Sequence, residues 1–227
     1  MKESQKLFIV VAAYNEEKRI SKVIKDLKKH GYKNIIIVDD CSKDDTSKVA
    51  SKFKVTLIRH PINKGQGAAL KTGMDCALRQ GADIIIHFDG DGQHFASEIP
   101  KLMAPLKKGY DITIGSRFLD KRTKMPLSKK ILLKGCVVVL RIFYGLKVTD
   151  AHNGFRALNK KAAQKIRITC NRMAHASEII DEIKRNKLRF KEVPVKIYYD
   201  KETSAKGHGN FAQAMSVFFS MLKHKFR

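Results

Sequence analysis

The stretch IIIHFDGDGQH, residues 84–94, decides how the rest of the chain can be organised. Its first five residues are β-branched or aromatic, which predicts a buried strand, and the glycines that follow predict a tight turn. Asp89 and Asp91 stand in that turn, one residue apart. Ligands of open α/β sheets bind just outside the carboxyl ends of the strands. We therefore expect the two carboxylates to share a hard divalent cation, with Gln93 and His94 close behind.

Two structural alternatives for this turn fit the sequence less well. Asp-Gly is a signal for a β-hairpin, but residues 96–109 read as a helix and not as a second strand. An EF-hand loop counted from the first aspartate would need Gly where His94 stands and Glu where Pro100 stands. Gly90 and Gly92 instead suit a tight turn that leaves room for a ligand, so the metal site is the preferred interpretation.

Length and charge limit the classes of protein to which the chain can belong. With 227 residues it suits one large domain, at a prior of roughly 150 residues per domain, and it can bury a proper core. Its 46 Lys and Arg residues against 22 Asp and Glu residues give a net charge of +24. This excess favours polyanionic partners: nucleic acid, an anionic membrane surface or phosphorylated substrates.

Cysteine spacing and apolar runs indicate a cytoplasmic protein without a membrane span. The 4 scattered cysteines show no CxxC and no metal-ligand spacing, which fits reduced thiols. The apolar run near the N-terminus has only the length of a strand, so no signal peptide is predicted. The best candidate for a transmembrane segment, residues 131–148, is interrupted by Lys134, Arg141 and Lys147, so no membrane span is predicted either.

Strand and helix patterns alternate on both sides of the opening stretch. The expected strands cover residues 7–12, 34–38, 55–58, 84–88, 111–115 and 189–199. Helices are expected before Gly31, before Phe53, within 63–81, and near 97–108, 131–146, 159–166, 173–186 and 211–227. This order predicts an α/β fold with a parallel sheet and right-handed crossover helices.

Acids gather at the predicted carboxyl ends of successive strands. Glu16 and Glu17 follow the first strand, and Asp39 and Asp40 follow the second. Each of these acids alone could cap a helix or lie in a solvated turn. Together on one rim they predict a polar pocket, since carboxylates suit the N–H edge of a nucleobase and the hydroxyls of a ribose.

Cations follow the acids along the same rim. Arg117 ends the fifth strand, and the loop after it carries Lys129 and Lys130 among other basic residues. The alternatives for this loop are a solvated charged segment and a flexible clamp that closes over a phosphate. Residues 64–67, KGQG, match a dinucleotide-binding fingerprint only weakly, because Leu70 stands where the third glycine belongs.

The last expected helix, residues 211–227, is amphipathic with a basic tip. It suits either packing on the sheet or lying in a membrane interface, where aromatic bulk and terminal cations would both help.

Six motifs in order resemble family 2 glycosyltransferases, and among them the dolichol-phosphate mannosyltransferase-like enzymes. They are AAYNEE (12–17), VDD (38–40), NKGQGAA (63–69), DGDGQ (89–93), GSR (115–117) and DAHNGFRA (150–157). The resemblance implies a GT-A fold, which is a Rossmann-like, mostly parallel central sheet with helices on both faces. It also implies a nucleotide-sugar donor (GDP-mannose or a UDP-sugar), a Mg²⁺ or Mn²⁺ ion, inversion at the anomeric carbon, and a polyprenyl or dolichyl phosphate as acceptor.

The resemblance carries roles over to residues at matching positions. Nucleotide-sugar binding is expected of Ala12, Tyr14, Glu16, Asp39, Asp40, Lys64, Asp89 and Gly90. Metal binding is expected of Asp89, Asp91 and Gln93. Contacts to phosphate or acceptor are expected of Arg117, Lys129, Lys130, Lys134, Asn153, Arg156, Ser204 and Lys206. Asp91, Asp89, Arg117 and Glu178 are the candidate catalytic residues.

The acceptor stays open at this point. A phosphate acceptor is already anionic, whereas a hydroxyl of a lipid-linked or cell-surface glycan would need a base, with Glu178 or Asp150 as candidates. The loop 199–210 resembles the Tyr…Ser…Lys-Gly loop of transferases for cell-surface polysaccharides. A basic nucleic-acid-binding protein is the non-enzymatic alternative, but no recognised binding motif appears and no nucleic acid is expected.

The resemblance also suggests a division of the chain and a location. Residues 1–227 are expected to form one domain, with a nucleotide-sugar-binding half (1–115) and an acceptor-side half (116–227). The basic surface would dock on anionic headgroups, each nearby cation contributing about 1 kcal/mol. The protein is therefore expected in the cytoplasm, attached peripherally to the cytoplasmic face of a membrane.

Overall fold

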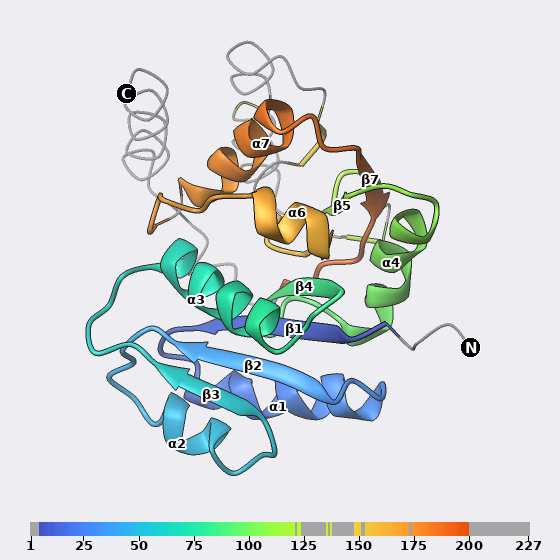
Figure 1. Cartoon of the computed structure of the whole chain (residues 1–227). Coiled ribbons are helices and arrows are strands. Elements are labelled where there is room, and N and C mark those ends of the chain that lie inside the picture. Colours follow the sequence, from blue (N-terminus) through green and yellow to red (C-terminus); the bar gives the residue numbers. More distant parts are fainter. Residues whose placement is uncertain are drawn as a thin grey trace.

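One sheet organises the part of the chain that the computed structural model describes, residues 5–120, 122–123, 135, 137, 148–150, 153–172 and 174–199. Its strands are Leu7–Ala13 (β1), Asn34–Asp39 (β2), Thr56–Arg59 (β3), Ile84–Asp89 (β4), Ile112–Ser116 (β5), Arg156–Asn159 (β6) and Phe190–Pro194 (β7). Their order is β3-β2-β1-β4-β6-β5-β7, and among these strands only β6 runs antiparallel to its neighbours (Figure 1).

Helices cover both faces of the sheet, as predicted. The described helices are Glu17–Lys29 (α1), Thr46–Ala50 (α2), Gln66–Arg79 (α3), the 3₁₀ turn Ala96–Glu98 (η1), Ile99–Lys107 (α4), Lys160–Lys165 (α6) and His175–Arg185 (α7). α1, α2 and α4 share one buried apolar cluster with side chains such as Ile9 and Val11 of β1. α3, α6 and α7 share the other cluster with Val10 of the same strand, so successive residues of β1 face opposite layers.

Periodicity explains why the first helix forms where it does. Ile20, Val23, Ile24 and Leu27 recur at intervals of three or four residues, and all four side chains are buried. Gly31, with a φ of +83°, follows the end of the helix, in a left-handed conformation that glycine adopts without a steric penalty. The apolar pattern therefore fixes both the length of α1 and the face that it presents to the sheet.

The strand register brings the predicted acids to one edge. Ala12 of β1 pairs with Asp89 of β4, and Ala13 pairs with Asp39 of β2. Because these strands are parallel, their carboxyl ends meet at the same edge of the sheet. The turn after β4 and the loops after β1 and β2 therefore face a common space.

The strand β6 is absent from the sequence-based prediction. It lies between β4 and β5, with Ala157 opposite both Ile86 and Thr113. Its sequence, RALN, has only four residues and begins with the fully buried Arg156, so neither length nor alternation marks it as a strand. Its position carries residues 153–156 to the edge of the sheet where the acids lie.

Other boundaries differ from the prediction in smaller ways. The last strand was predicted over residues 189–199 but ends at Pro194, which has no N–H to extend the ladder. The helix predicted to run up to Phe53 covers only Thr46–Ala50. The predicted helix 211–227 and nearly all of the predicted helix 131–146 lie outside the described residues. No helix in the described part of the chain is long and apolar enough to cross a membrane.

Candidate active site

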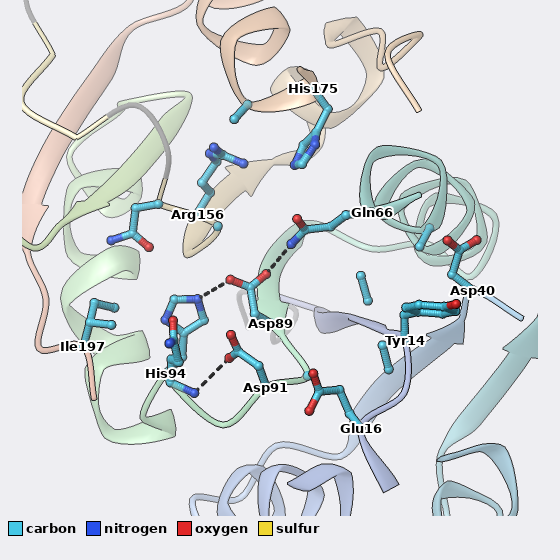
Figure 2. A pocket seen from close by; sticks show the side chains of 18 of the residues that line it. Tyr14, Glu16, Asp40, Gln66, Asp89, Asp91, His94, Arg156, His175 and Ile197 are labelled. Atoms are coloured by element: carbon cyan, nitrogen blue, oxygen red, sulfur yellow. Dashed lines mark hydrogen bonds and ion pairs between the residues drawn. The ribbon is translucent and has the colours of Figure 1, made fainter. Parts of the chain in front are cut away.

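A cavity of about 350 Å³ opens at the carboxyl ends of β1 and β4 (Figure 2). Three groups of residues line it: the end of β1 with the segments that follow β1 and β2, the turn after β4, and segments that lie far away in the sequence. The lining residues of these groups are Ala12, Ala13, Tyr14, Glu16 and Asp40; Asp89, Gly90, Asp91, Gln93 and His94; and Gln66, Ala69, Arg117, Asn153, Gly154, Arg156, His175, Ala176 and Ile197. Most of the predicted site residues that the structure describes therefore meet in one place.

The carboxylate of Asp89 is held by the protein itself. Gln66 Nε2 donates to Oδ1 at 2.7 Å, and His94 Nε2 donates to Oδ2 at 2.9 Å. The His94 ring stacks on Phe155 with centroids 4.7 Å apart, which fixes the donor. Burial alone would raise the pKa of Asp89, but the neighbouring His94 and Arg156 outweigh burial and lower this pKa. Asp89 is therefore an ionised carboxylate with a fixed orientation.

Asp91 is the less engaged of the two carboxylates. Its Oδ1 accepts a hydrogen bond from the Gln93 N–H at 3.0 Å. Burial, and then the charge of Asp89, raise the pKa of Asp91 to about 6. Two nearby, partly buried carboxylates repel each other, so a bound cation would relieve an unfavourable charge at this point.

The residues around Asp91 suit a Mg²⁺ or Mn²⁺ ion that also binds water and phosphate oxygens. They do not suit an ion whose ligands all come from the protein. Nowhere in the described chain do three His, Cys, Asp or Glu side chains gather as a ligand set. Mg²⁺ typically takes one or two carboxylates from a protein and fills its other positions with water and phosphate oxygens. Asp91, with Asp89 and Gln93 beside it, can supply the ligands that come from the protein, and a diphosphate would supply phosphate oxygens.

The exposed end of the cavity is built around Tyr14 and Asp40. Tyr14 is 41% exposed at the mouth, and Figure 2 shows its ring near Asp40. The Asp40 carboxylate accepts hydrogen bonds from the backbone N–H groups of Lys64 and Gly65 at 2.9 and 2.5 Å, and it contacts His60 Nδ1 at 2.7 Å. Asp40 thus joins the wall of the cavity to the loop before α3.

Two predicted nucleotide-binding residues are not brought into this cavity. Asp39 is fully buried, and its carboxylate accepts hydrogen bonds from the Ser42 N–H and from the hydroxyls of Ser42 and Ser47. Asp39 therefore stabilises the segment after β2 through these hydrogen bonds. Lys64 lines an adjoining groove, together with Lys71 and other residues, and reaches the cavity wall only through its backbone bond to Asp40.

The other end of the cavity is cationic. Arg117 Nε donates to Asp150 Oδ2 at 2.6 Å, and Arg117 Nη1 donates to the Tyr199 hydroxyl at 2.8 Å. Arg156 is fully buried, and burial lowers its pKa to about 10 although Asp89 and Asp150 act in the opposite direction. These guanidinium groups stay positive at neutral pH.

Five of the predicted phosphate or acceptor residues cannot be placed. They are Lys129, Lys130, Lys134, Ser204 and Lys206, and all of them lie outside the described residues. The described members of the same prediction, Arg117, Asn153 and Arg156, all line the cavity.

Glu178 does not line the cavity. It lies on α7, and its carboxylate accepts hydrogen bonds from the N–H groups of Thr169 and Cys170 at 2.8 and 2.9 Å and from the Thr169 hydroxyl. The side chain therefore fixes the segment before α7. Asp150, the other candidate base, is paired with Arg117.

Three polar side chains of the cavity were not assigned a role from the sequence: Gln66, His94 and His175. Gln66 belongs to the recognised motif NKGQGAA, and His94 directly follows DGDGQ. Their positions in or next to these motifs could therefore have identified both as site residues. His175 had none, because only the packing of α7 brings it to the cavity.

The mostly parallel sheet, with helices on both faces and a polar cavity at its carboxyl edge, is a GT-A fold. The glucosyl-3-phosphoglycerate synthase of Mycobacterium tuberculosis, solved in complex with Mn²⁺, UDP and glucosyl-3-phosphoglycerate, shares this fold. Its TM-score is 0.75 at 18% identity, over 98% of this chain and 80% of that one. The chain belongs to glycosyl transferase family 2, whose sequence model matches residues 8–167, and it is a glycosyltransferase.

Two relatives match almost the whole chain, and a third matches most of it. An uncharacterized protein of Methanocaldococcus jannaschii is 42% identical over 96% of this chain and 92% of its own length. The UDP-N-acetylglucosamine–dolichyl-phosphate N-acetylglucosaminyltransferase of Methanococcus voltae is 35% identical over 96% of both chains. The dolichol-phosphate mannosyltransferase of Pyrococcus furiosus is 32% identical over 72% of this chain and 49% of its own.

Proposed function

We propose that the protein transfers a sugar from a nucleotide sugar to a polyprenyl or dolichyl phosphate, with a divalent metal ion and inversion at the anomeric carbon. The distribution of charge in the cavity carries this proposal. The lining acids Glu16, Asp40, Asp89 and Asp91 lie toward the mouth and the turn after β4 (Figure 2). The other end presents Arg117 and Arg156. A donor diphosphate with its metal suits the first region, and an anionic acceptor suits the second.

The state of the candidate bases favours a phosphate acceptor over a hydroxyl. Glu178 and Asp150 both hold other parts of the protein, and neither lines the cavity. A hydroxyl nucleophile would need a base within hydrogen-bonding reach of its proton. A phosphate oxygen is already anionic and needs none. The names of the relatives from M. voltae and P. furiosus, both dolichyl-phosphate transferases, support the same acceptor class.

The donor is a UDP-sugar or GDP-mannose, and the ion is Mg²⁺ or Mn²⁺. Asp91 and Gln93, with Asp89 beside them, would hold the ion. The solved relative in complex with Mn²⁺ and UDP supports this cofactor class. When bound, the metal would neutralise charge on the departing nucleoside diphosphate.

The chain's own residues would bind and orient the two substrates. Tyr14 and Asp40 would bind the nucleoside, and Arg117 would hold the acceptor phosphate. An oxygen of that phosphate would attack the anomeric carbon from the face opposite the diphosphate. One carbon–oxygen bond forms as the other breaks, and the nucleoside diphosphate leaves with the electron pair. Arg117 suits the role of orienting residue because Asp150 and Tyr199 fix its guanidinium.

Peripheral attachment to the cytoplasmic face of a membrane is part of this proposal. Its support is the net charge of +24, which favours anionic headgroups, and the lipid acceptors named in the relatives.

A transfer assay tests the proposed function. The full chain is incubated with a polyprenyl phosphate and UDP-N-acetylglucosamine, UDP-glucose or GDP-mannose, each with and without Mn²⁺. We expect one donor to yield a lipid-linked sugar only when the metal is present. Transfer to glycan hydroxyls but not to the lipid phosphate would contradict the acceptor class. The absence of any metal-dependent nucleotide binding would contradict the donor site.

A further inference from the structure

His175 lines the cavity beside Arg156 and Gln66, although it comes from a distant part of the chain. It is the first residue of α7 and is 2% exposed, so a ligand can reach its ring only from inside the cavity. Figure 2 shows the ring pointing between Arg156 and Gln66 toward Asp89. The proposed nucleoside position near Tyr14 lies apart from this ring, on the side of the cavity that also carries Asp40.

Contacts on two sides fix the His175 ring. Its Nδ1 lies 2.8 Å from the carbonyl oxygen of Arg172. Its Cβ packs against Gly67, where an added Cβ would lie 2.8 Å from the His175 Cβ. A side chain at position 67 would therefore displace the histidine. A residue held in this way can discriminate between ligands, because its polar atom cannot move to follow a poorer one.

The hydrogen bond to Arg172 determines which ring nitrogen carries the hydrogen. A carbonyl oxygen can only accept, so Nδ1 is the donor. Burial, and then the charge of Arg156, lower the pKa of His175 to about 4, so the ring is neutral at physiological pH. A neutral ring with its hydrogen on Nδ1 has a bare lone pair on Nε2. No described residue donates a hydrogen bond to that atom.

We propose that His175 Nε2 accepts a hydrogen bond from one hydroxyl of the transferred sugar and thereby selects the sugar, an inference that rests on the proposed function. An ionised phosphate oxygen has no hydrogen to give to this lone pair, so the ionised diphosphate and acceptor phosphate do not suit it. A sugar hydroxyl can donate to Nε2 while it accepts from a neighbouring cation such as Arg156. His175 would thus be a specificity-determining residue.

Binding measurements with the full chain test this assignment independently of the acceptor. The probes are UDP, UDP-N-acetylglucosamine, UDP-glucose and GDP-mannose in the presence of Mn²⁺, followed by monodeoxy forms of the sugar nucleotide that binds most tightly. We expect removal of one particular hydroxyl to weaken binding by about tenfold, the effect of losing one hydrogen bond of roughly 1.4 kcal/mol. His175→Leu is expected to weaken binding of the parent sugar nucleotide by the same factor. It should change binding of that deoxy analogue by less than about threefold.

His175→Gln supplies the matched control, because its amide oxygen offers an acceptor in place of Nε2. We expect it to recover part of the affinity and part of the discrimination against the deoxy analogue. UDP with Mn²⁺ should bind both variants as it binds the wild-type protein, which shows that they are folded. An equal loss for the parent and every deoxy analogue, or no loss for any, would overturn this assignment alone. The failure of every nucleotide sugar to bind the wild-type protein would overturn the assignment and the proposed donor site together.

Discussion

The backbone of Gly154 lies directly against the carboxylate of Asp89. A Cβ atom added at Gly154 would lie 2.6 Å from Asp89 Oδ1 and 2.8 Å from Asp89 Cγ. Real Cβ atoms essentially never approach so closely, so any side chain at position 154 must displace the carboxylate or the backbone. A glycine contributed by the segment before β6 is therefore a condition for the position of Asp89 after β4.

Gly154→Ala should disable the site. Displacing Asp89 breaks its hydrogen bonds with Gln66 and His94, so we expect kcat/KM to fall by about a hundredfold, as a misplacement of about 1 Å can do. The measurement is steady-state kinetics with the donor identified by the transfer assay. Gly135→Ala is the matched control, because a Cβ at Gly135 would meet nothing within 4 Å. Equal activity of the two variants would contradict the role of the close approach.

Binding of Mn²⁺ should depend on pH through Asp91. The pKa of Asp91 is raised to about 6 in the folded protein. In the metal-free protein, protonated Asp91 therefore stabilises the fold fully at pH values below the ordinary pKa of an aspartate. That contribution is lost as the pH rises through about 6, where the ionised carboxylate becomes available to the metal. Below pH 6 we expect the affinity for Mn²⁺ to fall by about tenfold per pH unit, because one proton competes with the ion.

Titration calorimetry of Mn²⁺ with UDP at pH 5, 6 and 7 measures this dependence. Asp91→Asn should abolish the pH-dependent part of the affinity. Asp75→Asn is the control, because Asp75 is half-exposed and pairs with Lys71 away from the cavity. An affinity that stays constant from pH 5 to 7 in the wild-type protein would contradict the assignment of Asp91 as metal ligand.

Removing Arg117 should destabilise the fold as well as weaken the acceptor site. Its partner Asp150 is 1% exposed in the pair, so Arg117→Ala leaves a buried carboxylate without its cation. We expect the free energy of unfolding to fall by about 3 kcal/mol, and Asp150→Asn in the same chain to restore part of it.

Urea unfolding measures these differences. Lys71→Ala breaks an exposed ion pair with Asp75 and should cost less than about 1 kcal/mol. If Arg117→Ala proved as mild as this control, Arg117 and Asp150 would not form the tight pair described above.

Glu178→Gln should affect stability more than turnover. The carboxylate accepts three hydrogen bonds from residues 169 and 170, and an amide oxygen cannot replace both carboxylate oxygens as acceptor. We expect a loss of about 1–3 kcal/mol in the free energy of unfolding. At a temperature where the variant is fully folded, its kcat should stay within about threefold of the wild-type value, a change below 0.7 kcal/mol. A variant of unchanged stability that has lost turnover would instead identify Glu178 as a base.

The first half of the fold, from β1 to β5, could be predicted because its signals are local. Residues 7–12 and 35–38 are continuous apolar runs, and residues 84–88 are apolar except for His87; this is the pattern of parallel strands buried on both faces. The rule that ligands bind at carboxyl ends then placed Glu16, Asp40 and Asp89 on one rim without knowledge of the strand order.

The rest depended on contacts that no local pattern encodes. Which of the consecutive residues Asp39 and Asp40 reaches the cavity depends on how the loop after β2 turns. Both are buried, but Asp40 lines the cavity whereas Asp39 binds Ser42 and Ser47. β6 forms because it pairs with β4 on one side and β5 on the other, since its four residues alone carry no strand signal. His175 arrives through the packing of a whole helix.

The place of β6 in the sheet has a consequence for biosynthesis. The chain leaves the ribosome from its N-terminus, so β4 emerges about seventy residues before β6, the strand that it pairs with on that side. Until then one edge of β4 has no strand to bond, and an unpaired edge is a template for association with other chains. The nascent protein would be most prone to aggregation in that interval. Its cavity, which needs Gly154 and Arg156 in place, would be completed only after nearly the whole described chain has been synthesised.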